Sequence, residues 1–279
     1  SCNDLDVDDN VDFNVSLAPE NTYKAGEPVV FNFDGNPDYI TWWSGEEGHV
    51  YANRERTELP LEEIESVTLS FEAQARYGKV TNTLSLFVSD DFPGLSKDAA
   101  TDKARVADFE TNATSLSSNG ELLESKFANR TATSFDLTPY SASEMTLAFH
   151  YKADFDGKNS LKRWDFYSVA ITTVYKNGNT TTLGVADLGL MAFDCNPNTD
   201  PQHAQHGDPY FDNSSGSGSC SGVWDLRSSL TRVNSFTYLG GGPSETYTND
   251  ADDWLFTKAL KLNTCDPDEN SGVLKNINV

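Results

Sequence analysis

The chain is dominated by short segments in which apolar and polar residues alternate. A period of two places the apolar side chains on one face of a strand and the polar side chains on the other. Turn-forming Gly, Asn, Asp and Pro residues separate many of these segments. The strands that we expect are 11–17, 28–33, 39–43, 66–73, 82–88, 145–151, 169–175, 180–185 and 253–262. The pattern predicts an all-β protein, with a short helix or a covering segment at 99–107.

The charge of the chain excludes one large class of function. Asp and Glu total 43 residues and Lys and Arg total 20, which leaves a net charge of −23. A sequence-independent grip on nucleic acid needs a basic face, so we expect no nucleic-acid partner. The same charge disfavours docking on anionic lipid. Aromatic residues make up 11% of the chain, which is typical of a protein with a packed core.

The length and the turns suggest two domains behind a tether. A chain of 279 residues is long enough for about two domains. The turn-rich segment 90–96 places the boundary near Gly94. We therefore expect a tether at 1–11, an Ig-like sandwich at 12–93 and a second β domain at 94–279. Within the second domain, Lys176-Asn177-Gly178-Asn179 predicts a tight hairpin turn.

The first residues resemble a lipoprotein start. Cys2 is followed by the acidic stretch 3–10, which has the composition of a solvated, extended linker. This arrangement is similar to the acidic export signal behind the lipidated cysteine in surface lipoproteins of Bacteroidetes-type bacteria. The resemblance implies that Cys2 carries lipid and that the protein is exposed at the cell surface of the outer membrane. The lipid would then be its only contact with the membrane.

Two further stretches resemble known modules. Ala-Gly-Glu-Pro-Val-Val-Phe-Asn-Phe-Asp-Gly-Asn-Pro at 25–37 is similar to the opening of polycystic-kidney-disease-like (PKD-like) Ig modules. Its continuation through Arg54 resembles Bacteroidetes surface lipoproteins found with starch-utilisation-type glycan-uptake systems. Asp-Trp-Leu-Phe-Thr-Lys-Ala-Leu-Lys-Leu at 253–262 resembles an element of jelly-roll, galactose-binding-like adhesin domains. These resemblances imply an Ig/PKD-like β-sandwich followed by a jelly-roll-like β-sandwich.

The stretch 194–225 is the candidate ligand-binding loop. Long loops in compact domains are usually functional or disordered. Tyr210 and Trp224 offer ring faces for sugars, and His206 and Asp208 offer polar contacts to hydroxyls. Trp43 is a further aromatic candidate in the first domain. Two alternatives remain open: a solvated loop, or a divalent-metal site made by His203, His206 and Asp208.

Cysteines and acidic turns supply the other candidate sites. Cys195 and Cys220 bracket a Gly/Ser-rich loop and form the easiest disulfide to close. Cys265 would then be unpaired, and three reduced thiols are the alternative. Asp154, Asp156 and Asn159 place oxygen ligands as calcium loops do, but the sequence favours a plain turn, because the Gly is misplaced for an EF-hand and no Glu follows at the right distance. We therefore expect no cofactor, with calcium at this turn as the alternative.

The sequence and its resemblances together favour a non-catalytic, cell-surface glycan-binding lipoprotein that captures polysaccharide. Its expected partners are a polysaccharide or oligosaccharide and an outer-membrane glycan-uptake complex. An adhesion or scaffold protein that binds another protein is the alternative, for which a large exposed apolar patch would argue. A hydrolase would need a deep cleft with two close carboxylates. We therefore expect no enzymatic activity.

Overall fold

The computed structural model describes residues 13–17, 31–35, 63–197, 207–214, 220–227, 232–242 and 250–262. The chain divides into two compact units. One comprises Ser1–Thr57 together with Cys265–Val279, and the other is Glu58–Thr264. Among the described residues, no helix has the length and apolar character needed to cross a membrane.

The described part of the first unit is a pair of antiparallel strands. Strand β1 (Phe13–Leu17) pairs with β2 (Phe31–Gly35), and the rings of Phe13 and Phe33 stack with centroids 6.0 Å apart. Both strands overlap segments in which the alternation predicts strands. Trp43 and the strand expected at 39–43 lie outside the described residues, as does Cys2.

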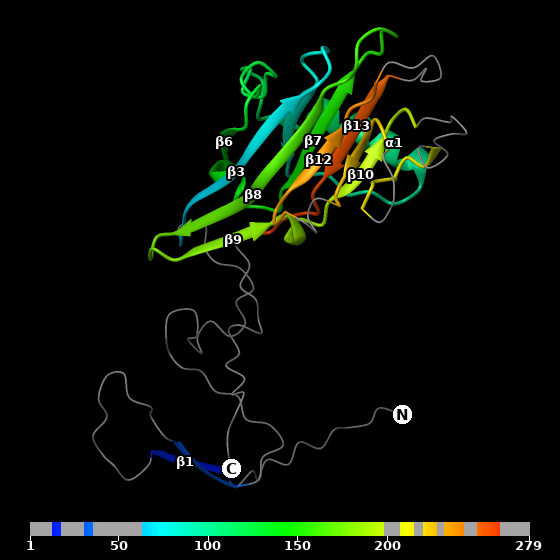
Figure 1. The fold of residues 1–279 in the computed structure, drawn as a ribbon. Helices are drawn as coiled ribbons and strands as arrows, with labels where there is room; N and C mark the ends of the chain where they lie inside the picture. Colours follow the sequence, from blue (N-terminus) through cyan, green and yellow to red (C-terminus); the bar gives the residue numbers. More distant parts are fainter. Residues whose placement is uncertain are drawn as a thin grey trace, which may run out of the picture. The chain divides into compact units, whose positions relative to one another are not determined.

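The larger unit is a sandwich of two antiparallel sheets (Figure 1). The five-stranded sheet has the order β10 (Met191–Asp194), β13 (Ala251–Phe256), β7 (Thr146–Ala153), β4 (Leu84–Ser89) and β5 (Thr114–Ser115). The six-stranded sheet has the order β11 (Val223–Asp225), β12 (Phe236–Leu239), β8 (Arg163–Tyr175), β3 (Ile64–Arg76) and β6 (Thr131–Asp136), and β9 (Thr180–Gly184) also pairs with β8. The expected all-β sandwich fold is therefore confirmed.

The boundary expected near Gly94 is wrong, because strands on both sides of it share the same sheets. Strand β3 pairs with β8 along most of its length, and β4 pairs with β7. Both β3 and β4 precede residue 94, yet their partners follow it. The larger unit begins at Glu58, so the loop 90–96 is an internal connection. Local turn signals could not reveal this, because strand pairing joins segments far apart in the sequence.

Large aromatic side chains fill the space between the sheets. Phe149 on β7 lies edge-on to Phe166 on β8 and Phe236 on β12, with ring centroids 5.2 and 5.4 Å apart. The fully buried aromatic side chains that pack in this core are Trp164, Trp224, Tyr151, Tyr238, Phe127, Phe149, Phe166 and Phe236. Each such ring removes a large apolar area from water, so this layer supplies much of the stability of the unit.

Helix α1 (Ala99–Asn112) covers the outer face of the five-stranded sheet. Asp98 caps the helix by accepting a hydrogen bond from the Thr101 N–H. The ring of Phe109 lies edge-on to Trp254 and Phe256 on β13, 5.6 and 5.1 Å away. The helix predicted at 99–107 is confirmed. Two short 3₁₀ turns, η3 (Thr138–Tyr140) and η4 (Val185–Asp187), complete the described helical elements.

A buried carboxylate fastens the start of this helix. Asp102 is fully buried and accepts hydrogen bonds from the Ser96 and Lys97 N–H groups and the Ser96 hydroxyl, at 2.7 to 2.8 Å. The Tyr210 hydroxyl donates a further bond at 2.6 Å. Burial opposes ionisation, but these hydrogen bonds outweigh it and hold the pKa of Asp102 below its usual value. Asp102 therefore ties the helix to the loop around Tyr210.

Replacing Asp102 by Asn should destabilise the larger unit by about 2–4 kcal/mol, because it removes a buried charge that four donors satisfy. Since the pKa of Asp102 is lowered in the folded state, its contribution is present above the unfolded-state pKa and is lost as the pH falls through the folded-state pKa. Urea unfolding between pH 3 and pH 7 measures both effects. Asp108→Asn on the exposed side of the same helix is the control; equal losses in the two variants would contradict the assignment.

Candidate functional site

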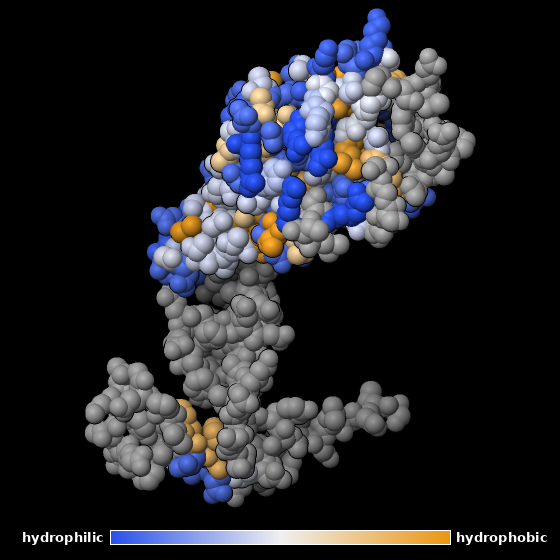
Figure 2. All heavy atoms as spheres, viewed as in Figure 1, coloured by the Kyte–Doolittle hydropathy of each residue, from blue (hydrophilic) through white to orange (hydrophobic). Residues whose placement is uncertain are grey.

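The outer face of the six-stranded sheet is polar. Along β3, Thr68, Ser70, Glu72, Gln74 and Arg76 are partly exposed, while the residues between them are buried in the core. Figure 2 shows hydrophilic residues gathered over the face of the larger unit that carries β3 and β8. The sheet therefore presents side-chain hydroxyls, amides and charges to solvent.

A β-bulge in β8 sets which of its side chains reach this face. Phe166 and Val169 both point into the core although three positions separate them. The pairing with β3 shifts register here, and Ser168 adopts a positive φ of 53°. The extra residue restores the alternation, so Arg163, Asp165 and Tyr167 all lie on the outer face. Bulges commonly re-aim side chains in this way beside functional sites.

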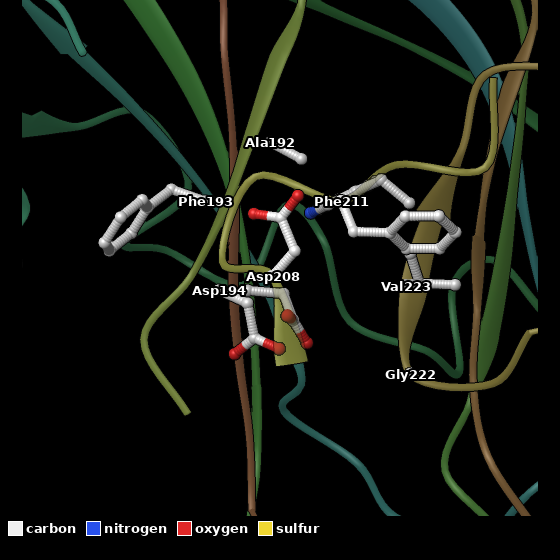
Figure 3. Close-up of a pocket in the computed structure, with 9 residues that line it drawn as sticks. Ala192, Phe193, Asp194, Asp208, Phe211, Gly222 and Val223 are labelled. Carbon is white, nitrogen blue, oxygen red and sulfur yellow. The ribbon is translucent and has the colours of Figure 1, made fainter. Parts of the chain in front are cut away.

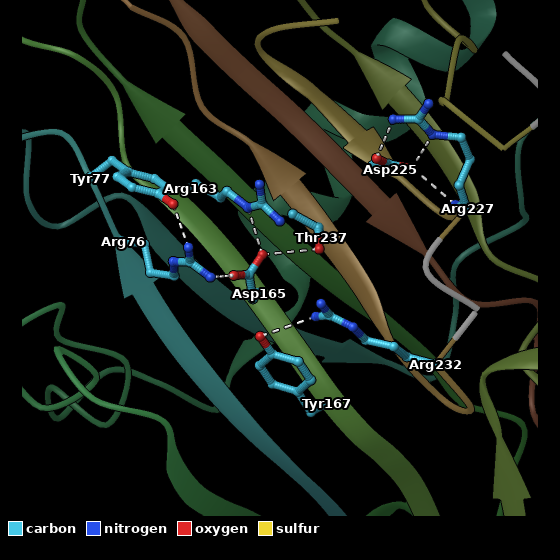
Figure 4. A network of polar contacts seen from close by, with 9 residues as sticks. All are labelled: Arg76, Tyr77, Arg163, Asp165, Tyr167, Asp225, Arg227, Arg232 and Thr237. Atoms are coloured by element: carbon cyan, nitrogen blue, oxygen red, sulfur yellow. Dashed lines mark hydrogen bonds and ion pairs between the residues drawn. The ribbon is translucent and has the colours of Figure 1, made fainter. Parts of the chain in front are cut away.

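Asp165 organises two arginines on this face (Figure 4). Its side chain is 1% exposed, and it accepts hydrogen bonds from Arg163 Nε at 2.7 Å and Arg76 Nη1 at 3.1 Å. The Thr237 hydroxyl, on the neighbouring strand β12, donates to Asp165 Oδ1 at 3.1 Å. Three donors from three strands thus hold one buried carboxylate, and the two guanidinium groups are fixed in direction.

A glycine-lined groove opens beside these arginines. It has a volume of about 490 Å³ and is lined by Tyr77, Ser160, Arg163, Ser221, Arg227 and the run Gly240–Gly242, among others. A volume of this size is typical of small-molecule sites. A Cβ added to Gly78 would lie 2.4 Å from the Ser160 oxygen, and one added to Gly240 would lie 2.4 Å from the Leu161 oxygen. Only glycine permits this close packing of backbones, which forms the wall of the groove.

Tyr77 stands at this groove with most of its side chain in solvent. It is 64% exposed, the most exposed aromatic among the large apolar side chains that the structure describes. Its hydroxyl accepts a hydrogen bond from Arg76 Nη2, and the Arg76 guanidinium lies 4.8 Å from its ring centroid. The Arg76 guanidinium, itself held by Asp165, therefore braces the ring.

A second groove surrounds Tyr167, further along β8. It has a volume of about 360 Å³ and is lined by Arg130, Tyr167, Ser168, Arg232, Val233 and Ser235. The guanidinium carbons of Arg130 and Arg232 lie 4.0 and 5.5 Å from the Tyr167 ring centroid. These are cation–π distances, and Arg130 also pairs with Glu72 at 2.6 Å. We call this the Tyr167 groove.

Trp224, predicted as a sugar-stacking residue, lies in the core instead. It is 1% exposed and sits edge-on to Tyr238 and Phe236, 4.9 and 6.1 Å away. The prediction is wrong because Trp224 is the inward-facing residue of β11. A tryptophan beside a Gly/Ser-rich loop looks exposed in the sequence, and only the strand's orientation reveals that it is buried.

Tyr210 also serves the structure. Its hydroxyl donates to Asp102, its ring meets Phe193 edge-on at 5.6 Å, and the Lys97 ammonium lies 4.5 Å from its centroid. Burial and the Asp102 carboxylate raise the pKa of Tyr210. These contacts hold Tyr210 in place while it remains half-buried, and its role as a sugar-stacking residue stays a prediction. His203 and His206 lie outside the described residues.

Asp208 and Trp224 do meet, but around a small cavity rather than an open site (Figure 3). Its volume is about 10 Å³, enough for about one water molecule and far too small for a sugar ring. The segment 207–214 closes the edge of the sandwich here. The Asp194 N–H donates to the Pro209 oxygen at 2.7 Å, and the Asn213 N–H donates to the Trp224 oxygen at 2.9 Å.

Two of the three carboxyl groups that line this cavity face each other across neighbouring strands. Asp194 on β10 and Asp253 on β13 are direct cross-strand neighbours, and the Tyr238 hydroxyl donates to Asp253 at 2.6 Å. Burial raises the pKa of Asp194 to about 6. Burial and the facing Asp194 raise the pKa of Asp253 well above its usual value. Two such groups do not ionise together, so Asp253 stays protonated when Asp194 is charged.

The expected Cys195–Cys220 disulfide is wrong, because Cys195 carries a free thiol. Burial and the nearby acidic groups raise the pKa of this thiol, which keeps it protonated and unreactive. Hydrogen bonds from the segment 207–214 close this region, where we had expected a covalent bridge. Cys265 lies outside the described residues.

The acidic turn proposed as a calcium loop is built from hydrogen bonds. Asp156 accepts from the N–H groups of Lys158 and Asn159 at 2.8 Å and from the Asn159 side-chain amide at 2.7 Å. Asn159 thus presents its nitrogen to Asp156, and Asp154 takes no part in these bonds. Among the residues that the structure describes, no three His, Cys, Asp or Glu side chains form a group suited to a metal. Calcium at this turn stays a prediction.

The residues of the two grooves escaped the sequence analysis. A signal was present in Arg163-Trp164-Asp165-Phe166-Tyr167, where charged or polar residues alternate with large aromatics. We expected the strand to begin at 169, because the bulge at Ser168 interrupts the period. Arg76 and Tyr77 follow the strand expected at 66–73, and nothing local marks them as neighbours of Arg163.

The acid pair predicts an unusual pH dependence. Because the folded state raises the pKa of Asp194 to about 6, it binds more protons than the unfolded state, and stability falls as the pH rises from about 4 to 6. Asp194→Asn should remove a loss on the order of 2 kcal/mol over this window. Urea unfolding at several pH values measures it, with Asp90→Asn at an exposed position as the control. An unchanged pH profile in Asp194→Asn would contradict the raised pKa.

Comparison with known proteins gives a family but no activity. Residues 1–193 match a family model described as "Domain of unknown function (DUF5017)". The match includes Arg76, Tyr77, Arg163, Asp165 and Tyr167, while Asp225, Arg227 and Thr237 follow it. No curated protein matches the chain. No solved structure matches it either. Because the family model spans well over half of the sequence, the chain belongs to the DUF5017 family.

Proposed function

We propose that the protein binds a polysaccharide on the outer face of its six-stranded sheet and does not cleave it. The observation that carries the proposal is Tyr77, an exposed ring beside the glycine-lined groove and braced by Arg76. Sugar rings present apolar C–H faces that stack on aromatic side chains. Their hydroxyls need hydrogen-bond donors and acceptors around that stack.

The groove lining matches these needs. Ser160 and Ser221 lie along it, and the wall contributes backbone amides and carbonyls through Gly240–Gly242. Arg163 adds donors whose direction Asp165 fixes before any ligand binds. A preorganised donor loses little freedom on binding, so each contact contributes more to affinity. An open groove on a sheet face also suits one stretch of a long polymer.

The charges in this groove support binding rather than hydrolysis. Most glycoside hydrolases place two carboxyl groups on either side of the scissile bond. Asp225 is the one carboxylate that lines the described part of the groove. It is paired with Arg227 through bonds of 2.8 and 3.0 Å. That arrangement neutralises the carboxylate and leaves no second one opposite it among the described lining residues.

A cell-surface location belongs to the same proposal. The resemblance of residues 2–10 to a lipoprotein start suggests that Cys2 carries lipid, and a tethered binder would hold polymer near an uptake complex. The alternative of an adhesion protein stays a prediction. The large apolar side chains exposed among the described residues are Val15, Tyr77, Leu123 and Val233.

Affinity electrophoresis of the full 279-residue chain through gels containing neutral or acidic polysaccharides tests the proposal. At least one polymer should retard the protein, and Tyr77→Ala should weaken that binding about tenfold through loss of the stacking ring. Tyr77→Phe keeps the ring and should retain most of the affinity. Thermal unfolding of each variant checks that the fold is intact. If retardation is the same in Tyr77→Ala and the wild type, the ligand binds elsewhere.

A further inference from the structure

Arginine is concentrated on the outer face of the six-stranded sheet. The chain has eight arginines, and five of them, Arg76, Arg130, Arg163, Arg227 and Arg232, lie at the two grooves or their connecting network. Figure 4 shows four of these around β8, β12 and β11. The carboxylates that pair with them are Glu72, Asp165 and Asp225. At the two grooves the arginines therefore outnumber the carboxylates that pair with them, in a protein whose net charge is −23.

Asp165 leaves one positive charge uncompensated. Arg76 and Arg163 are direct cross-strand neighbours, an arrangement that destabilises a sheet when the charges are alike. The buried Asp165 lies between them and binds both, but one carboxylate neutralises only one guanidinium. The two arginine side chains remain 35% and 36% exposed, so the remaining charge faces solvent.

Arg163 has a free binding edge. Its Nε donates to Asp165, whereas neither Nη group has a hydrogen-bond partner within the part of the chain that the structure describes. The side chain also lines the glycine-lined groove. Two adjacent Nη donors on a planar guanidinium match the two oxygens of a carboxylate or a sulfate. Their direction is set by the bond to Asp165.

We propose that the ligand is an acidic polysaccharide and that Arg163 binds its carboxylate or sulfate groups, an inference that rests on the function proposed above. Tyr77 stacks a sugar ring at the glycine-lined groove, and Arg163 binds an acidic substituent there. The Tyr167 groove, with Arg130 and Arg232, receives a second acidic unit. Arg163 and Tyr167 are four residues apart on β8, a separation of about 13 Å, so one extended oligosaccharide spans both.

The overall charge does not prevent this binding. At physiological ionic strength the Debye length is about 8 Å, so carboxylates on distant parts of the molecule are largely screened. The guanidiniums in the grooves act over direct-contact distances, where screening is weak. The acidic surface still repels polyanions that cannot fit the grooves. Selectivity for an acidic glycan over other polyanions follows from this combination.

Matched polymers and matched variants test the inference. The full chain is run by affinity electrophoresis in polygalacturonate, carboxyl-reduced polygalacturonate, chondroitin sulfate, two neutral glucans and polyglutamate. We expect polygalacturonate or chondroitin sulfate to bind, which also distinguishes carboxylate from sulfate. Arg163→Gln should weaken that binding by about 10- to 100-fold. Arg163→Lys keeps the positive charge but loses the two adjacent Nη donors, so its affinity should lie between those of Arg163→Gln and the wild type.

The control is Arg105→Gln, which makes the same charge change on helix α1, at the other sheet. It should leave binding unchanged, and thermal unfolding should show both variants folded. Binding to neutral polymers alone, or equal binding to the carboxyl-reduced polymer, would overturn the inference while the proposed function stands. If polyglutamate binds as well as the acidic polysaccharides, charge alone explains the binding, and the inference is also overturned. Failure of every polymer to bind would overturn both.

Discussion

The aromatic layer between the two sheets is the constraint on which the larger unit depends. Phe149, Phe166, Phe236 and Trp224 interlock at centroid distances of 4.6 to 6.4 Å, and each comes from a different strand. Rings of this size fill the core only if the aromatic residues of every strand point inward. On β8 the inward-facing residues Phe166 and Val169 are three positions apart, which breaks the period of two. The bulge at Ser168 allows both side chains to point into the core. The same bulge keeps Arg163, Asp165 and Tyr167 on the outer face, so core packing positions the candidate site.

Three buried carboxyl groups show how the fold manages charge in different ways. Asp102 is ionised and satisfied by four donors at the start of α1. Asp253 is kept neutral by burial and by the facing Asp194. Asp165 is paired with two arginines at the surface of the sheet. Asp102 and Asp253 act in the interior of the fold, where Asp102 contributes to stability and Asp253 takes part in its pH dependence. The third is buried between Arg76 and Arg163, and Arg163 lines the glycine-lined groove. We propose that the guanidinium charge left uncompensated there gives this face its preference for acidic ligands.

Much of the fold could be predicted from the sequence, and the reason is local. Alternation and the turn at Asn177-Gly178 predicted strands and a hairpin that the structure contains, and the helix after residue 98 was expected. The predictions that failed concern long-range relations. The boundary near Gly94 failed because β3 and β4 pair with strands that follow it. Trp224 failed as a ligand contact because the direction of β11 places its side chain in the core.

The sequence alone predicts an acidic, aromatic-rich, all-β chain, because composition and period-two alternation can be read directly along it. It held the residues of the two grooves but gave no reason to group them, since Arg76 and Arg163 are far apart along the chain. Only the tertiary structure made them cross-strand partners and placed Asp165 between them. Strand register decides such neighbours, and register depends on how the whole aromatic core packs.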